Sequence, residues 1–424
     1  MGTPAIVFDE INPLPRLLMG PGPINADPRV LRAMSAQLLG QFDPQFRRYM
    51  REVMVLYRQL FQTNNEWSLI IDGTARSAIE AVMASAVEPG ERVLIASFGR
   101  FGQLLAEIAR RVGAHVRVVD AEWGTVFTPE RIEEAIKAHT PRLLALCQGD
   151  TSTTMLQPLA EIGGICRRYG VLLQLDATAT FGGTPLPIDT WKIDAATAGL
   201  QKCLGGPSGA SPVTMSEDFS KIIYRRRHIE EGLRPKDYMP GPGRMIGSNY
   251  FDLAMVMDYW SEQGLNHHTE ATTMLYGARE CARILLQEGI EQCYARHDLA
   301  GRAMVAGVQA MGLRVYGDVT NKMPNITGVC VPEGVNPDRA RGAMLTDFNI
   351  EIGTSFGPLQ GKVWRIGAMG YNARKDAVLL TLAAFETVLA AEGYKLARGA
   401  GVDAALAVYR AAEPGICAAD RADS

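Results

Sequence analysis

A single lysine interrupts an uncharged stretch of the chain, TAGLQKCLGGPSG at residues 197–209. No carboxylate lies close to Lys202 in the sequence, so nothing local would neutralise its ammonium group. Burying an unpaired ammonium is costly, which favours a lysine whose pKa is lowered. A lysine of this kind is suited to act as a nucleophilic amine that forms a Schiff base.

Other polar and aromatic residues follow apolar runs that are typical of buried strands. These runs alternate with helical patterns, and the alternation indicates an α/β fold with a mostly parallel sheet flanked by helices. The five runs are WSLIIDG, RVLIASFG, RLLALCQGD, VLLQLDATA and DAATAGLQK. Ligands of such sheets bind beyond the carboxyl ends of the strands. We therefore expect one edge of the sheet to collect Thr74, Ala75, Arg76, Phe101, Thr151, Asp176 and Lys202.

An imine at Lys202 would give its neighbours roles in pyridoxal 5'-phosphate (PLP) chemistry. Asp176 could pair with the pyridine nitrogen, which must be protonated if the ring is to act as an electron sink. The helix that opens at Thr74, together with Arg76, could bind the phosphate, and Phe101 could stack on the ring. Each residue also has an ordinary structural interpretation. Asp176 could be a turn residue, Thr74 a helix cap and Phe101 a core side chain.

Composition restricts the class of protein. The chain has 424 residues, of which 47% are hydrophobic and 21% charged, as expected for a globular protein of two domains. A formal net charge of -3 provides no basic field for nucleic acid or anionic lipid. The seven cysteines are scattered without a CxxC pair, and neither a signal peptide nor a long apolar run is evident. We expect a cytoplasmic protein that acts on small molecules.

The pattern also divides the chain. We expect an N-terminal arm at residues 1–22, a large domain at 23–288 and a smaller C-terminal α+β domain at 289–424. Within the smaller domain, residues 313–332 are typical of a hairpin-like strand pair, and residues 376–394 of an amphipathic helix.

A series of motifs along nearly the whole chain resembles a known family, the class V aminotransferases of the alanine–glyoxylate and serine–glyoxylate group. The motifs, in order, are GPGP, DGTARSAIEA, FGRFGQ, GDTSTTMLQPL, LDATATFGGTPL, GLQKCLGGPSG and KVWRIGAMGYN. These relatives are fold-type I PLP enzymes. The resemblance therefore implies a PLP-dependent transaminase that works as a homodimer with active sites shared between subunits.

The resemblance assigns roles to individual residues. Lys202 would bind the cofactor covalently and move the proton, Asp176 would pair with the pyridine nitrogen, and Thr178 would lie beside the ring. Thr151 would reach the ring hydroxyl, and Phe101 occupies a stacking position that is more often Trp in relatives. The residues around the phosphate would be Thr74, Ala75, Arg76, Gln201 and, from the other subunit, Thr269. Gly22 would lie at the substrate.

Arg365 in KVWRIG is the candidate for binding the substrate carboxylate. A guanidinium group can form two parallel hydrogen bonds with a carboxylate, and a position between Trp364 and Ile366 is unusual for a solvated charge. The alternative is a surface cation on an edge strand.

Two amides distinguish the chain from the alanine–glyoxylate pattern. Gln41 follows Gly40, and Asn266 stands where those relatives commonly have Tyr, three residues before Thr269. Amides carry both donors and an acceptor and so suit a ureido group. The pairing resembles the (S)-ureidoglycine–glyoxylate aminotransferases of purine breakdown, which form oxalurate and glycine. Alanine or serine as the donor remains an alternative, with Gln41 and Asn266 as ordinary loop residues.

Other functions fit the sequence less well. No G-x-G-x-x-G follows a strand, which disfavours a dehydrogenase. A non-catalytic protein of this fold would be expected to lack Lys202 or Asp176. No cysteine stands on a recognisable mobile loop near the site, as a desulfurase would require. We expect no metal site, because the adjacent His267 and His268 should point in different directions.

Overall fold

The computed structural model describes residues 8–412. Residues 1–7 and 413–424 lie outside the described part, and with them Cys417, the start of the expected arm and the end of the expected small domain. In the described part, none of the helices has the length and apolar character needed to cross a membrane.

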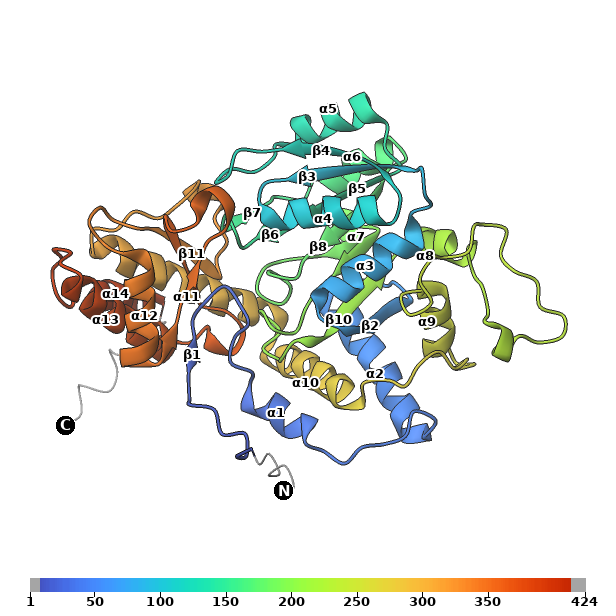
Figure 1. Cartoon of the computed structure of the whole chain (residues 1–424), viewed down its shortest axis with the longest axis horizontal. Coiled ribbons are helices and arrows are strands. Elements are labelled where there is room, and N and C mark those ends of the chain that lie inside the picture. Colours follow the sequence, from blue (N-terminus) through green and yellow to red (C-terminus); the bar gives the residue numbers. More distant parts are fainter. Residues whose placement is uncertain (1–7, 413–424) are drawn as a thin grey trace, which may run out of the picture.

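A seven-stranded sheet forms the centre of the larger part of the molecule (Figure 1). In spatial order its strands are β2 (Trp67–Gly73), β10 (Gly209–Met215), β9 (Ala195–Thr197), β8 (Leu172–Asp176), β5 (Leu143–Cys147), β3 (Arg92–Ser97) and β4 (His115–Asp120). Only β10 is antiparallel to its neighbours. The five predicted strands are present, and β4 and β10 are two further strands that were not predicted.

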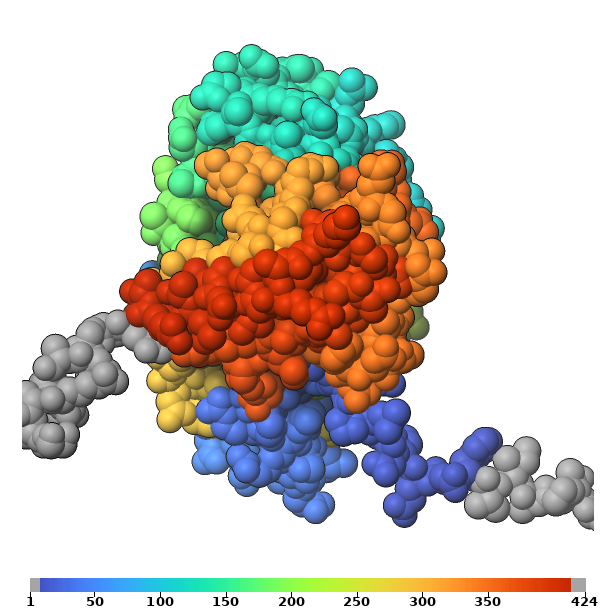
Figure 2. All heavy atoms as spheres, turned by 90° about the vertical axis from the view of Figure 1, so that its left-hand side faces the viewer, coloured from blue at the N-terminus to red at the C-terminus, as the bar shows by residue number. Residues whose placement is uncertain are grey.

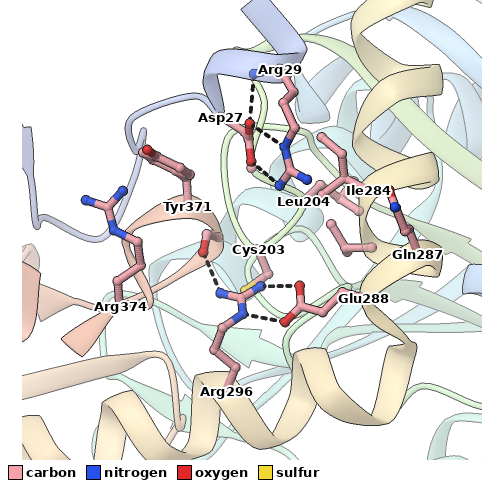
Figure 3. Close-up of a pocket in the computed structure, with 13 residues that line it drawn as sticks. Asp27, Arg29, Cys203, Leu204, Ile284, Gln287, Glu288, Arg296, Tyr371 and Arg374 are labelled. Carbon is pink, nitrogen blue, oxygen red and sulfur yellow. Dashed lines mark hydrogen bonds and ion pairs between the residues drawn. The ribbon is translucent and has the colours of Figure 1, made fainter. Parts of the chain in front are cut away.

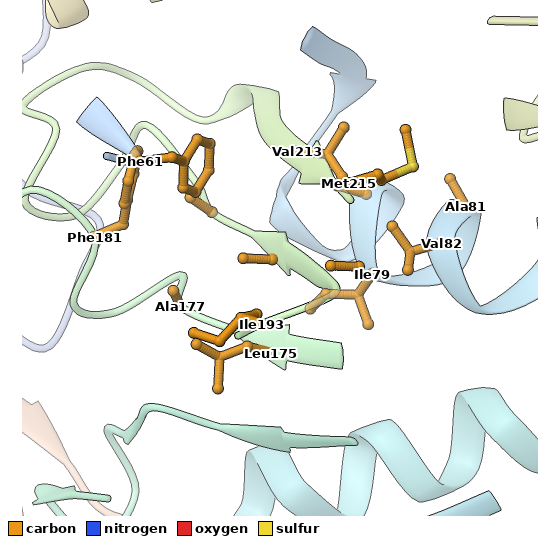
Figure 4. Packing of buried hydrophobic residues seen from close by; sticks show 14 of the residues in the cluster. Phe61, Ile79, Ala81, Val82, Leu175, Ala177, Phe181, Ile193, Val213 and Met215 are labelled. Carbon is orange, nitrogen blue, oxygen red and sulfur yellow. The ribbon is translucent and has the colours of Figure 1, made fainter. Parts of the chain in front are cut away.

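Helices cover both faces of this sheet, because their apolar sides must be buried against it. They are α1 (Pro28–Met34), α2 (Pro44–Leu60), α3 (Ala75–Ala86), α4 (Arg100–Arg111), α5 (Pro129–His139), α6 (Ile162–Arg168), α7 (Ile188–Trp191), α8 (Glu217–Tyr224), α9 (Leu253–Trp260) and α10 (Thr272–Glu288). Figure 4 shows Ile79 and Val82 of α3 beside Val213 and Met215 of β10. This packing fixes the position at which α3 begins, beside the carboxyl end of β2.

The C-terminal part has its own layer of strands and helices. Its helices are α11 (Ile290–Ala310), α12 (Pro337–Phe348), α13 (Lys375–Ala391) and α14 (Ala400–Ala412). Its antiparallel sheet contains β11 (Ile326–Cys330), β14 (Val363–Gly367) and β13 (Gly353–Thr354), and β12 (Ile350–Glu351) pairs with β1 (Leu17–Leu18). Figure 2 shows these C-terminal elements covering one face of the molecule, with the last helices in red.

Two large apolar clusters lie mostly on opposite sides of the domain boundary that we propose at residue 289, and a small third cluster joins the two parts. One cluster runs from Val30 to Cys293 and packs around the large sheet. The other joins Met19 to residues between Ala300 and Tyr409. Since Met19 and β1 pack on the second cluster, the described part of the arm contacts the C-terminal elements.

One local prediction was only partly right and another was wrong. The 313–332 segment folds back on itself through an antiparallel bridge between Val315 and Val329, but it forms only one true strand, β11, whose main partner is β14. The strand before Lys202 also ends earlier than expected, at Thr197. Lys202 therefore lies in the turn that follows β9, where its backbone is not restricted by the sheet.

Candidate active site

Lys202 is buried at the carboxyl edge of the large sheet, with 9% of its surface exposed. Its Nζ donates a hydrogen bond to the Pro21 carbonyl, which belongs to the GPGP motif. Burial, together with the nearby Arg365 guanidinium, lowers the pKa of Lys202 to about 8. The lowered lysine pKa expected from the sequence is thus borne out by its surroundings.

Asp176 ends β8, the strand next to β9, and is 6% exposed. Its Oδ1 accepts a hydrogen bond of 2.9 Å from the Thr178 backbone N–H. Burial raises the pKa of Asp176, while the hydrogen bonds from Thr178 oppose that effect. A buried carboxyl of this kind gains a strong partner when a protonated ring nitrogen lies beside it.

A cavity of about 200 Å³ joins these two residues. Its lining includes nearly all the residues that the resemblance places around the cofactor: Thr74, Ala75, Arg76, Phe101, Thr151, Asp176, Thr178, Gln201 and Lys202. The N-terminus of α3 opens into this lining, and Gly73 makes the sharp turn before it with a φ of +116°. The Thr74 side chain does not cap the helix, so it leaves the backbone N–H groups of the first turn available for an anion.

Asp150 stands between two residues of the cavity lining, Gly149 and Thr151, and supports the wall that carries Phe101, a role that was not predicted from the sequence. Its Oδ2 accepts hydrogen bonds from the backbone N–H groups of Phe101 (2.8 Å) and Gly102 (3.3 Å). Gly99 must be small here, because a Cβ would lie 2.5 Å from the Asp150 carboxyl carbon. This acid therefore fixes the start of α4 and with it the position of the Phe101 ring.

Arg365 lies in the middle of β14 and is 4% exposed, which contradicts its interpretation as a surface cation. Its Nε donates to the Thr354 carbonyl (2.8 Å) and its Nη1 to the Thr151 carbonyl (3.0 Å). Nη2 has no acceptor among the described residues. Arg365 is thus held rigidly beside the Lys202 cavity with part of its guanidinium group free to bind.

Gly22 packs directly on Lys202. Its φ is +105°, and a Cβ at this position would overlap the end of the lysine side chain. The glycine is therefore needed both for the backbone conformation and for the space that Lys202 occupies.

Three residues predicted for the site lie outside the Lys202 cavity. Gln41, Asn266 and Thr269 are not among the described residues that line the Lys202 cavity. Instead, Gln41 Nε2 donates to Asn266 Oδ1 at 3.0 Å, and Thr269 is exposed. The structure thus brings the two amides together but separates them from Lys202 of the same chain.

A larger cavity of about 410 Å³ lies on the other side of the lysine turn, where Cys203 lines it (Figure 3). Its charged groups largely neutralise one another, because Arg29 pairs with Asp27 and Arg296 with Glu288. It contains none of the predicted site residues.

Residues 31–358 match the family described as aminotransferase class-V, and the chain belongs to this family. It is 50% identical over 396 residues to an (S)-ureidoglycine–glyoxylate transaminase of Bacillus subtilis, covering 93% of this chain and 95% of that protein. It is 34% identical over 372 residues to an alanine–glyoxylate aminotransferase of Drosophila melanogaster, covering 87% and 90%.

A solved structure of ureidoglycine–glyoxylate aminotransferase from Bacillus subtilis superimposes on the fold with a TM-score of 0.89 and 49% identity, covering 95% of this chain and 100% of that one. These similarities confirm the predicted family, the aminotransferase activity and the fold-type I architecture.

Proposed function

We propose that the Lys202 cavity binds pyridoxal phosphate. Two polar atoms of its lining, Thr178 Oγ1 and Gln201 Oε1, are buried without a hydrogen-bond partner among the described residues. The cavity also offers a helix N-terminus for a phosphate, an acid for a ring nitrogen and an aromatic face for a ring. The residues present therefore fit the cofactor.

The roles proposed from the sequence agree with this geometry. Thr74, Ala75, Arg76 and Gln201 would surround the phosphate, Thr151 the ring hydroxyl and Phe101 the ring face. The cofactor supplies an electron sink that stabilises negative charge at the substrate's α-carbon. Asp176 supports this by keeping the ring nitrogen protonated.

Lys202 would bind the cofactor covalently at rest and, once released by the amino substrate, would carry the α-proton as a general base. Its lowered pKa suits this role, because more of the amine is unprotonated near neutral pH. Arg365 would bind the carboxylate common to donor and acceptor through Nη2, since Nη1 donates to the carbonyl and the hydroxyl of Thr151.

We propose that the amino donor is (S)-ureidoglycine and the acceptor glyoxylate, giving oxalurate and glycine as a step of purine breakdown. The observation that carries this proposal is the 50% identity to the Bacillus subtilis transaminase over 93% of the chain. Alanine or serine as donor is the second candidate, favoured by the 34% identity to an alanine–glyoxylate enzyme, which is a more distant relative.

Gln41 and Asn266 would recognise the ureido group. Their mutual hydrogen bond uses Gln41 Nε2 and Asn266 Oδ1, so the Asn266 amide N–H₂ and Gln41 Oε1 take no part in it. Gln41 Oε1 is buried and has no other hydrogen-bond partner in the described chain. A ureido group offers both donors and an acceptor for such atoms. Since both amides lie outside the Lys202 cavity of their own chain, we propose that they and Thr269 complete the site of a second subunit in a homodimer.

The six described cysteines are all free, which supports the reducing cytoplasm as the proposed location.

The two halves of the reaction can be tested separately. Purified protein loaded with PLP and given ureidoglycine alone should release oxalurate in an amount equal to the enzyme, and glyoxylate added afterwards should yield an equal amount of glycine. Borohydride reduction before substrate should fix the cofactor to the peptide that contains Lys202. Lys202→Ala should still hold the cofactor through its phosphate but should release no oxalurate. Release of oxo acid by Lys202→Ala at the wild-type rate would contradict the proposal.

A further inference from the structure

Three metal-binding side chains converge outside the Lys202 cavity: Asp72, His268 and Glu270. Asp72 belongs to β2, and the other two belong to the segment 265–271 that leads into α10. One potential ligand atom from each residue lies within 4.8 Å of the other two. The fold thus brings two carboxylates and one imidazole together from segments about 200 positions apart in the chain.

The carboxylates of this cluster lack the partners that buried charges require. Glu270 is 3% exposed, and neither of its oxygens has a hydrogen-bond partner in the described part of the chain. Asp72 Oδ2 accepts from the Ala271 backbone N–H at 3.0 Å, but Asp72 Oδ1 has no partner there either. Two adjacent acids in this condition must share a proton or lie beside a positive charge, and a bound cation would supply that charge.

The neighbouring arginine, Arg47, forms no hydrogen bond or ion pair with either carboxylate in the described part of the chain. Arg47 directs Nη1 to the Tyr259 carbonyl and Nη2 to the Ser261 carbonyl, each at 2.9 Å. Its hydrogen-bonding atoms therefore serve the end of α9 rather than the carboxylates.

The contact between His267 and His268 determines which ring nitrogen of His268 carries a proton and which one faces the acids. His267 Nε2 lies 3.0 Å from the Asn249 carbonyl, which can only accept, so Nε2 carries the proton. In a neutral ring His267 Nδ1 is then an acceptor, and its partner at 2.7 Å, His268 Nδ1, must donate. In its neutral form His268 then presents the lone pair of Nε2 to Asp72 Oδ2 at 3.3 Å and to Glu270 Oε2 at 3.7 Å, whereas a protonated ring would donate from Nε2 to the same oxygens.

We propose that Asp72, His268 and Glu270 bind a divalent transition-metal ion of the zinc class. Ligand atoms about 2.1 Å from a tetrahedral ion lie about 3.4 Å apart, close to the two distances found here. A metal-binding histidine usually donates its other ring N–H to a second group, as His268 does to His267. The buried Tyr259 hydroxyl, also without a described partner, is available to a water in the fourth position.

Such an ion would tie the segment 265–271 to the end of β2. That segment carries Asn266 and Thr269, so the ion would hold both residues in place, a consequence that rests on the proposed function. The expectation of no metal site assumed that His267 and His268 point in different directions. The 2.7 Å contact between their rings contradicts that assumption.

The test measures metal binding and does not depend on activity. Holoenzyme dialysed against a weak chelator should retain about one zinc ion per chain by elemental analysis. Cobalt(II) added to chelator-stripped protein should give the visible absorption of a tetrahedral site. Glu270→Gln should weaken zinc binding at least tenfold, and His267→Ala should weaken it about 10- to 100-fold through loss of the second hydrogen bond.

The matched control is Glu262→Gln, which removes an exposed acid just upstream of the same segment and should bind zinc like wild type. The proposal is overturned if wild-type protein neither retains zinc nor gives the cobalt absorption, since a shared proton would then balance the acids. It is equally overturned if Glu270→Gln binds zinc as tightly as wild type. Neither result would affect oxalurate release by the wild-type enzyme.

Discussion

Gln41 donates a hydrogen bond of 3.0 Å from Nε2 to Oδ1 of Asn266, which joins two residues 225 positions apart in the chain. The bond orients both amides, so that the remaining Gln41 oxygen and Asn266 nitrogen are presented together. A pair ordered in this way recognises a ligand without the cost of fixing each side chain separately.

Truncating one amide should reduce discrimination between donors. Asn266→Ala removes the orientation of Gln41 as well as its own hydrogen bond, so we expect kcat/KM for ureidoglycine to fall roughly tenfold or more. The value for alanine should change little, because alanine has no group to bind there. Gln263→Ala, an exposed amide three residues upstream, is the matched control. Equal losses for both donors would show that Asn266 only shapes the pocket.

Replacing the guanidinium group of Arg365 should weaken the binding of both substrates. In Arg365→Lys a single ammonium replaces the planar group that donates to Thr151 and Thr354, so the paired hydrogen bonds to a carboxylate are lost. We expect KM for donor and for glyoxylate to rise roughly 10- to 100-fold, with little change in the cofactor's absorption. Arg302→Lys on the surface should leave both values unchanged. Unaltered kinetics in Arg365→Lys would show that Arg365 does not bind the substrate carboxylate.

The reactivity of Lys202 should depend on pH in a defined direction. Its pKa of about 8 means that cofactor-free protein should take up PLP faster as pH rises through about 8 and then level off. Because Arg365 contributes to this lowering, Arg365→Met should move the midpoint upward. Stopped-flow absorbance across pH would measure both midpoints, and an unchanged midpoint in the variant would contradict the coupling.

The same shift has a consequence for the stability of the cofactor-free protein. An unfolded lysine titrates near 10.5, so between about 8 and 10.5 the unfolded chain binds more protons than the folded one. The contribution of Lys202 to the free energy of unfolding should therefore become more favourable as pH rises through that window.

A methyl group at Gly22 should displace the lysine. Gly22→Ala places a Cβ where the end of the Lys202 side chain lies and also strains a backbone with φ of +105°. We expect borohydride to fix much less cofactor to the peptide that contains Lys202. Gly342→Ala on α12, where a Cβ meets nothing within 4 Å, should behave like wild type. Normal fixation in Gly22→Ala would show that the lysine can avoid the new group.

The sequence predicted the cavity because its residues follow strands in a regular way. Asp176 and Thr74 each stand at a strand end, and the parallel sheet brings such ends to one edge. The same reasoning could not give a role to Asp150, whose function is to accept backbone N–H groups at the start of α4. That contact depends on three-dimensional proximity, which no spacing along the chain reveals.

Strand pairing between distant segments also explains why β10 was not predicted and why the main partner of β11 was wrong. β10 runs antiparallel to both neighbours, and β11 pairs mainly with β14, more than thirty residues away, with only one bridge to the segment just before it. Pairing of this kind is decided by packing across the sheet rather than by local pattern. The acidic cluster at Asp72 and Glu270 was missed for the same reason.

The most direct test of the central claim is the donor preference of the wild-type enzyme with glyoxylate held constant. Values of kcat/KM should be measured for ureidoglycine, alanine and serine by following release of each oxo acid. We expect the value for ureidoglycine to exceed both of the others by about tenfold or more, because only ureidoglycine can satisfy the amides of Gln41 and Asn266. Equal or higher values for alanine or serine would contradict the proposed donor and would place the protein with the alanine–glyoxylate or serine–glyoxylate enzymes.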